Sequence, residues 1–474
     1  MSGIDTELVL PISEISEILQ KRPGLVSIDG IKRLSNLYGF ETFADAISGT
    51  VPPVERLSLS GKIVLIDIDF QAGVVSSVSI SSAVAIAPLG SAQLDFLNPA
   101  TSPNIEHILL ENLRCERLDS FNRNLRTLAQ LDRLSEPSPL DLFNFLHKLA
   151  YNLDCVAQYQ LKVACEVSAD KLKDLKDGYA GIGKIEINRD GKVGVFLKYW
   201  ENTRRIRRWI EARDRSRYNP GQFHIHFKFM EKMELETRAE PNAESASEVA
   251  VASEDAPLVD EKFPDVWFEN GKWLLTPGHV SRMATLVLEL LPCVWVPEGL
   301  VAKWGTRCEF IASDNSNDYN GRILDPSPID RMIGELNSGL YTQYSLNSRR
   351  LRISAIVGSR FVKLHKVMLS DVTQLQQIVD DLRSYCVLTN LLNRLLDEVT
   401  EYEEQAVPQI RLSDLAEGRV NGPTAAVGSS LVISNDNTGI KLLANGTSVT
   451  IRAGRLEGDS YLAVSEDLVL SRVL

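Results

Sequence analysis

The stretch from Arg56 to Ile80 constrains the fold of this chain more than any other. Between Ile63 and Phe70, apolar side chains alternate with a second set that includes Asp67 and Asp69. Because successive side chains of a strand point to opposite faces, this alternation predicts a strand with one apolar face and one face that becomes acidic. A short connection ending in Gly73 and a second β-rich run with alternating serines follow. The stretch therefore predicts a β-hairpin with one buried face.

Helical periodicity surrounds this hairpin. Apolar residues recur at spacings of three and four over 12–19, 27–37, 105–134 and 140–161. The stripe over 105–134 runs for many turns with polar residues on its other faces, and we expect it to break near Asp119. Prolines at 137 and 139 separate it from the next helix. We therefore expect these helices to cover one face of a sheet.

Strand patterns return further along the chain. We expect strands at 184–188, 192–200, 223–230, 350–357 and 360–369. The first two flank the Asp190-Gly191 pair, which is typical of a tight hairpin turn. A long helix is predicted at 372–404, and from Asn421 short β runs separated by Gly-containing turns predict a small meander.

Composition divides the chain into four parts. Residues 234–262 are rich in Glu, Ala, Ser and Pro and contain few large apolar side chains, so they cannot bury enough surface to offset chain ordering. The prediction is an α+β protein whose helices pack on mostly antiparallel sheets. Its parts are an N-terminal mixed lobe (1–233), a flexible acidic linker (234–262), a second mixed lobe (263–420) and a small β-rich segment (421–474).

Charge and cysteine usage exclude several classes of protein. The 474 residues carry a net charge of −12, which disfavours direct nucleic-acid binding because neutralising phosphates requires a basic surface. The six cysteines are scattered without a CxxC pair, so neither a zinc knuckle nor a disulfide framework is indicated. The most apolar window, 285–296, is too short to span a bilayer. We expect a cytosolic or nuclear protein without a membrane partner.

Two carboxylates on the central strand offer the first candidate for chemistry. Asp67 and Asp69 share one strand face, as a Mg²⁺- or Mn²⁺-dependent transferase requires. No third carboxylate stands at a motif spacing, and the glycine-serine entry loop of such transferases is missing. We favour a solvated strand face and keep the metal-dependent transferase as the alternative function.

Two other motifs have a chemical and a structural interpretation. His224 and His226 share a strand face and could contribute two ligands to zinc, but no third ligand is apparent nearby. The segment 178–184 has the spacing of a phosphate-binding loop, but Ile185 stands where a Ser or Thr must bind Mg²⁺. It also follows a charged segment and opens a strand, so we favour a loop that enters a hairpin.

The remaining motifs concern binding to other proteins. The arginine run from Arg204 to Arg217 could bind an acidic segment, act as a nuclear-import signal, or form a solvated helix face. Two overlapping L-x-x-L-L matches lie between Leu388 and Leu396, and this pattern docks helices into apolar grooves. Because they belong to one long leucine stripe, we favour core or subunit packing.

Four segments follow one another in an informative order: Gly30–Phe40, Glu55–Phe70, the following Val-Ser-rich strand, and Leu118–Ser135. This series resembles the fungal form of the Mediator subunit 1 family. The resemblance extends in order over roughly residues 5 to 400 and is strongest from Gly30 to Leu149. These are structural patterns, and none of them is a catalytic motif.

This resemblance implies a nuclear, non-enzymatic subunit of the Mediator coactivator without catalytic residues, metals or cofactors. Such a subunit would lie in the middle module, bind other middle-module subunits, and relay signals from DNA-bound transcription factors to RNA polymerase II. Animal members carry receptor-binding L-x-x-L-L boxes in a flexible region after the core. The matches here lie inside an apolar helix, so we do not transfer receptor binding to Leu388–Leu396.

Overall fold

The computed structural model of the protein supports a description of most of the chain. The described residues are 18, 20–47, 53–83, 94–98, 101, 103–135, 141–167, 181–202, 206, 210, 221–231, 266–269, 272–275, 284–311, 328–338, 342–346, 349–355, 360–369, 371–398, 429–436, 439–444, 447–452 and 455–456. Helices and mostly antiparallel sheets alternate along these residues, which confirms the predicted α+β class.

The predicted central hairpin forms one half of a four-stranded antiparallel sheet, with its second strand at one edge. Its strands, in spatial order, are β1 (Glu41–Ile47), β2 (Val54–Ser60), β3 (Val64–Gln71) and β4 (Val74–Ser82). Ile66 and Ile68 pair with Ile80 and Val78, and all four side chains point into the core. The hairpin and its buried face are therefore confirmed. The strand β1 was not predicted, because its alternation is weakened by two alanines.

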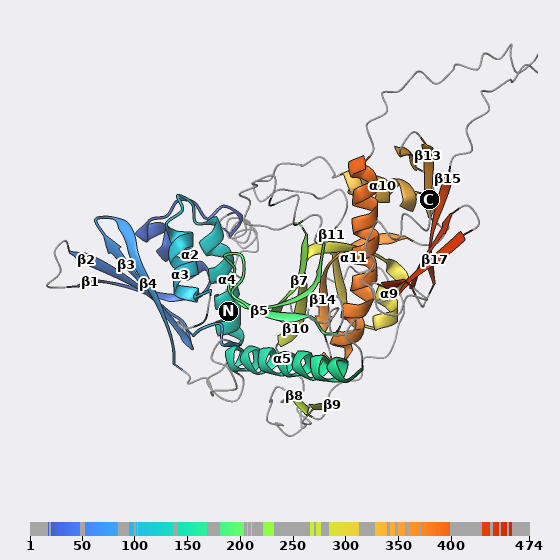
Figure 1. The fold of residues 1–474 in the computed structure, drawn as a ribbon. Coiled ribbons are helices and arrows are strands. Elements are labelled where there is room, and N and C mark those ends of the chain that lie inside the picture. The colour runs from blue at the N-terminus through green and yellow to red at the C-terminus, as the bar shows by residue number, and fades with distance from the viewer. Residues whose placement is uncertain are drawn as a thin grey trace, which may run out of the picture.

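Helices cover the apolar face of this sheet and lead to the next one (Figure 1). They are α2 (Ile28–Leu37), α3 (Ile105–Leu113), α4 (Asp119–Leu134) and α5 (Leu142–Val167). The α2 helix begins after Ser27, whose side chain accepts a hydrogen bond from the Gly30 amide. The gap between α3 and α4 confirms the predicted break near Asp119. The predicted helix over 12–19 lies almost entirely outside the described residues.

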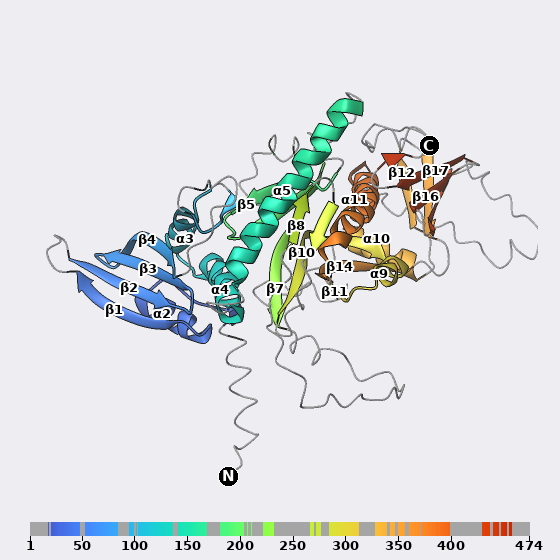
Figure 2. The same ribbon diagram turned by 90° about the horizontal axis from the view of Figure 1, so that it is seen from below.

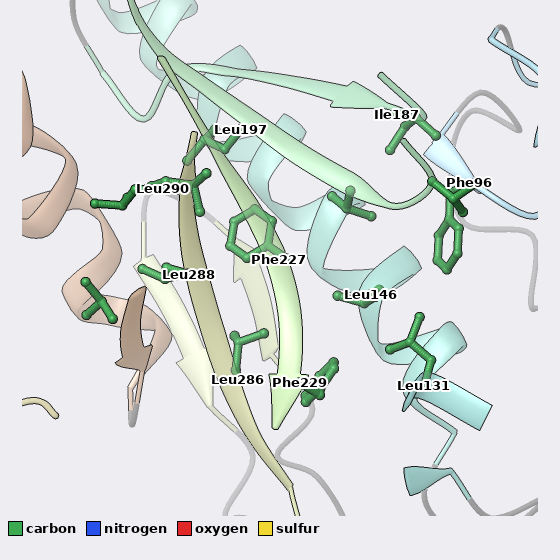
Figure 3. Packing of buried hydrophobic residues seen from close by; sticks show 14 of the residues in the cluster. Phe96, Leu131, Leu146, Ile187, Leu197, Phe227, Phe229, Leu286, Leu288 and Leu290 are labelled. Atoms are coloured by element: carbon green, nitrogen blue, oxygen red, sulfur yellow. The ribbon is translucent and has the colours of Figure 1, made fainter. Parts of the chain in front are cut away.

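A six-stranded antiparallel sheet forms the centre of the molecule. In spatial order its strands are β11 (Cys308–Ile311), β14 (Phe361–Leu369), β10 (Ala284–Pro297), β7 (Gln222–Glu231), β6 (Val195–Glu201) and β5 (Lys184–Ile187). One face carries apolar side chains that pack under α5 and under α11 (Leu375–Glu398), and Figure 3 shows Phe227, Phe229, Leu286 and Leu288 in this core. The opposite face carries most of the polar candidates described below.

This sheet joins strands from both sides of the predicted linker. The first eight residues of β10 pair with β7 from Ala284↔Glu231 to Leu291↔His224. The two mixed lobes expected from the sequence therefore share one sheet. Residues 234–262 lie outside the described residues, so the linker stays a prediction.

The C-terminal part adds a third sheet beside α11. Its strands, in spatial order, are β12 (Thr342–Leu346), β13 (Arg349–Ala355), β15 (Ser429–Asp436), β16 (Gly439–Ala444), β17 (Thr447–Arg452) and β18 (Arg455–Leu456). Strands β15 to β18 form the predicted meander, and β15 joins β13 in parallel. The smaller elements are β8 (Val266–Glu269), β9 (Lys272–Leu275), α9 (Glu298–Trp304), α10 (Pro328–Asn337) and the 3₁₀ turn η2 (Val372–Gln374).

One buried carboxylate attaches the four-stranded sheet to α4. Asp132 accepts hydrogen bonds from the backbone amides of Lys62 (2.7 Å), Ile63 (2.7 Å) and Val64 (3.0 Å), which form the β2–β3 turn. A β-carbon at Gly61 would lie 2.5 Å from an oxygen of this carboxylate. The turn therefore needs glycine at position 61, because a side chain there would collide with the carboxylate. It needs the Asp132 acceptor because buried amide groups need partners.

A buried arginine attaches α11 to the six-stranded sheet. Arg383 is fully buried, and its guanidinium donates to the backbone oxygens of Tyr199 (2.9 Å) and Gly181 (2.6 Å) and to the Asp380 carboxylate (2.7 Å). Gln376, two helical turns earlier on α11, donates to the same Gly181 oxygen. The helix is thus fixed by hydrogen bonds to a strand and to the segment that enters β5.

We expect Asp132→Ala to lower the free energy of unfolding by about 3 kcal/mol, because it leaves three amides, two of them buried, without their charged acceptor. Urea unfolding followed by circular dichroism measures this loss. Asp119→Ala on the same helix is the control: Asp119 pairs with the exposed Arg117, so its loss should cost less than about 1 kcal/mol. Equal effects of the two substitutions would contradict the role given to Asp132.

Candidate functional site

The two central carboxylates, Asp67 and Asp69, are bound by side chains of neighbouring strands. Arg56 on β2 contacts Asp69 through two hydrogen bonds (2.7 and 3.0 Å) and lies 3.9 Å from Asp67. Ser58 donates to Asp67 (2.6 Å) and Ser77 donates to Asp69 (2.9 Å). Arg56 and Asp69 are also direct partners in the β2–β3 register, so strand pairing itself brings them together.

This arrangement explains the electrostatics of the pair. The hydrogen bond from Arg56 is the main cause that lowers the pKa of Asp69 below its usual range, with a smaller contribution from Ser77. A guanidinium at this position takes the place that a divalent cation would need between the two carboxylates. The geometry supports a cross-strand link between Arg56 and the two carboxylates on the open face of the sheet.

The predicted histidines face the polar side of the six-stranded sheet. His224 and His226 are both buried on β7. His224 Nε2 lies 3.4 Å from Glu186 of β5 and also contacts Arg189. Arg189 contacts Glu186 and Gln222 as well, so it connects the β5–β6 turn to β7.

A second cluster surrounds Glu289 at the middle of β10. Lys228 Nζ lies 2.8 Å from Oε2 of Glu289, and His226 Nδ1 lies 3.5 Å from the same oxygen. His365 of β14 lies 3.6 Å from Oε1. The His226 ring stacks on Phe196 of β6, with ring centroids 4.2 Å apart. Strands β7 and β14 thus bring side chains to one carboxylate of β10, and β6 supports one of the two rings.

Burial and neighbouring charges shift the pKa values of these groups in opposite directions. Burial alone would raise the pKa of Glu289, but contacts with His226 and His365 and the charge of Lys228 outweigh it and hold the pKa well below the usual value. Burial lowers the pKa of His226 to about 4, so its ring is neutral at pH 7. The cluster is therefore a buried carboxylate balanced by one ammonium group and two imidazoles.

The structure separates the two histidines into different clusters. His224 belongs with Glu186 and Arg189, whereas His226 belongs with Glu289. Among the residues that the structure describes, no group of three or more His, Cys, Asp or Glu is arranged to hold a metal ion. Sequence reasoning missed Glu289 and His365, because one stands inside an apolar run and the other comes from a distant strand.

The glycine-containing segment enters a strand, as expected. Its described part, Gly181–Gly183, leads directly into β5 at Lys184, and Gly183 has a φ of +112°. A β-carbon at Gly183 would lie 2.5 Å from the backbone oxygen of Lys198 on β6. Here glycine permits the close approach of two strands.

The first L-x-x-L-L match is buried. Leu388, Leu391 and Leu392 of α11 are each at most 2% exposed and belong to the main core. This agrees with the packing interpretation and leaves that match without an exposed docking face. The side chains of 394–396, which complete the second match, lie outside the described residues, as does nearly all of the arginine run 204–217.

Two general features complete the description. The described helices include none that is both long enough and apolar enough to cross a bilayer. An open pocket of about 310 Å³ lies between α3 and the β5–β6 turn, lined by residues that include His107, Glu111 and Asp190. Glu111 and Asp190 are engaged in ion pairs with Arg114 and Arg189 at its rim.

Comparison with known proteins identifies one family. The family model of Mediator of RNA polymerase II transcription subunit 1 matches residues 13–273, more than half of the chain. The Schizosaccharomyces pombe protein of that name is 26% identical over 176 residues, which cover 37% of this chain and 35% of that protein. The Eremothecium gossypii protein of that name is 28% identical over 141 residues, covering 28% and 31%. The chain thus spans about a third of the length of the curated relatives it matches.

We expect the stability of the protein to fall between pH 7 and pH 5. The pKa of His226 is about 4 in the folded state and about 6.5 when unfolded, so the unfolded state takes up the proton first as the pH falls. This proton uptake should cost about 2 kcal/mol over that range. His226→Phe should remove most of this pH dependence in urea unfolding at the two pH values.

His107→Gln is the matched control for that experiment, because His107 is exposed on α3. It should leave the difference between the two pH values unchanged. Burial also lowers the pKa of His224, so a smaller pH dependence should remain in His226→Phe. A pH dependence as large as that of the unmodified protein would contradict the neutral state assigned to the His226 ring.

Leu391→Ala should lower the free energy of unfolding by about 3 kcal/mol, because it removes a buried side chain from the core around α11. Thermal or urea unfolding measures the loss, and Tyr159→Ala on the exposed side of α5 should cost far less. An unchanged stability would show that Leu391 lies on a surface available to partners.

Proposed function

Since the chain belongs to the Mediator subunit 1 family, we propose that it acts as a non-catalytic subunit of the Mediator coactivator complex in the nucleus. The observation that carries this proposal is the family match over more than half of the chain. The subunit would bind other subunits of the complex and take part in regulating transcription by RNA polymerase II.

The geometry of the polar candidates supports a structural role for them. Asp67 and Asp69 are linked to Arg56 across two strands, and Glu289 is enclosed by Lys228 and two histidines. In each cluster, charges of opposite sign from different strands face one another. Such pairs fix the register and packing of a scaffold, and the transferase alternative has no observation in its favour.

We place the subunit in the middle module and assign it a relay role between DNA-bound transcription factors and RNA polymerase II. Large subunits of permanent assemblies bind their neighbours through extended, partly apolar surfaces. The described surface offers exposed apolar side chains at separate places, among them Phe43 on β1, Val74 on β4 and Tyr159 on α5. Several neighbours could therefore be bound at once. Receptor docking through Leu388–Leu392 is not part of the proposal, because those side chains are buried.

Affinity purification of the tagged chain from nuclear extract, followed by mass spectrometry, tests the proposal. We expect several Mediator subunits in near-equal amounts, because permanent assemblies survive dilution and washing. RNA polymerase II should be present in smaller amounts. Recovery of the chain alone, or with membrane or ribosomal proteins, would overturn the proposed function.

A further inference from the structure

The outer strand of the four-stranded sheet has an open edge. β1 ends the strand order, and all seven of its residues pair with β2 in an unbroken register from Glu41↔Ser60 to Ile47↔Val54. In the part of the chain that the structure describes, no segment pairs with its other edge. An edge strand keeps a row of unpaired main-chain N–H and C=O groups, so β1 can pair with a further strand.

The opposite edge of the same sheet is covered. The α3 helix packs along β4, and the Ile80 amide donates to the Glu106 carboxylate (3.0 Å). The register of β3 and β4 also shifts between Asp69 and Phe70, and such irregularities discourage further pairing. Figure 2 shows β1 on the side of the sheet away from α3, with α2 beside it. Of the two edges, β1 is the regular one.

The side chains of β1 define which strand would fit. Glu41, Phe43 and Asp45 share the open face of the sheet, and Phe43 is 52% exposed. On the other face of the strand, Ala44 and Ala46 are exposed and leave room for larger side chains. Along its open face the strand therefore presents an acidic, an apolar and a second acidic side chain at alternate positions.

The two carboxylates of β1 are available for a partner. Asp45 stands opposite Arg56 in the register, but the guanidinium of Arg56 is turned to Asp69 on β3. Neither Glu41 nor Asp45 forms an ion pair with another described residue. A basic side chain from outside would meet little competition at either position.

We propose that β1 binds an extended segment of a partner protein as a fifth strand, with basic, apolar and basic side chains at successive alternate positions. The basic residues lie beside Glu41 and Asp45, and the apolar residue lies beside Phe43. Main-chain hydrogen bonds supply the attachment and the alternating side chains supply the selection. This inference rests on the proposed function, because it takes the partner to be a neighbouring subunit.

A second copy of this chain fits the edge less well. Two copies of β1 paired antiparallel about Phe43 would place Glu41 opposite Asp45 at both ends, and like charges directly opposite are destabilising. Each chain also carries a net charge of −12. A basic segment is favoured by both the local and the overall charge.

A capped, fluorescently labelled peptide, Thr-Lys-Val-Leu-Val-Lys-Thr, is the probe for this edge. Fluorescence polarisation measures its binding to the full chain, and hydrogen exchange with mass spectrometry locates it. We expect slower exchange in 41–47 and no binding of the same peptide with Glu in place of Lys. Slower exchange elsewhere but not in 41–47, or equal binding of both peptides, would overturn the proposal.

The matched variants are Asp45→Lys on β1 and Glu166→Lys on α5, both of which reverse one exposed charge. Asp45→Lys should lower the affinity for the peptide about tenfold, since it replaces an attraction by a repulsion. Glu166→Lys should leave this affinity within about twofold of that of the unmodified chain. Similar affinities for the two variants would refute the site. A concentration-dependent dimer that Asp45→Lys abolishes would assign the edge to a second copy and equally overturn the proposal.

The same two variants separate this inference from the proposed function. After purification from nuclear extract, the amount of at least one Mediator subunit should be lower with Asp45→Lys than with Glu166→Lys. If both variants retain every subunit equally, the edge-strand proposal fails while the family function stands. If the unmodified chain retains no Mediator subunit, the proposed function fails. The peptide measurement alone then tests the edge-strand proposal.

Discussion

The pairing of β7 with β10 is the interaction on which the rest of the structure depends. It joins segments that are separated by more than fifty residues of chain, and it gives the six-stranded sheet its two central strands. One face of this pair is apolar and lies under α5 and α11. The other face is largely buried, although it carries His224, His226 and Glu289. Because buried charges need partners, the polar side chains of that face have to meet across strands.

This constraint explains why chemically suggestive residues end in structural clusters. The sheet brings His226, Lys228 and His365 to Glu289, and it brings Arg189 to Glu186. The smaller sheet repeats the pattern with Arg56 between Asp67 and Asp69. With its core and polar clusters fixed in this way, the protein presents its open edge on β1, at the far side of the small sheet from α11 (Figure 1). This combination of a rigid body and an available edge suits the scaffold role that we propose.

Sequence reasoning recovered the elements whose signals are local. The hairpin of β3 and β4, the break between α3 and α4, and the C-terminal meander all follow from periodicity and turn residues. It failed for β1, where alanines blur the alternation, and for Glu289, which stands in an apolar run. Pairing over long distances explains the rest: no local pattern shows that β7 meets β10, or that Arg56 faces Asp69. The candidate residues could be found from the sequence, but their partners could not.

Native-state hydrogen exchange at β7 and β10 tests this account most directly. If the two strands form the centre of one sheet, their amides should open together, with similar free energies close to that of global unfolding. The amides of β1 should exchange far sooner. If β7 instead opened with the N-terminal elements at a much lower free energy than β10, the two lobes would be separate units. The shared sheet, and the structural role of the clusters on it, would then be contradicted.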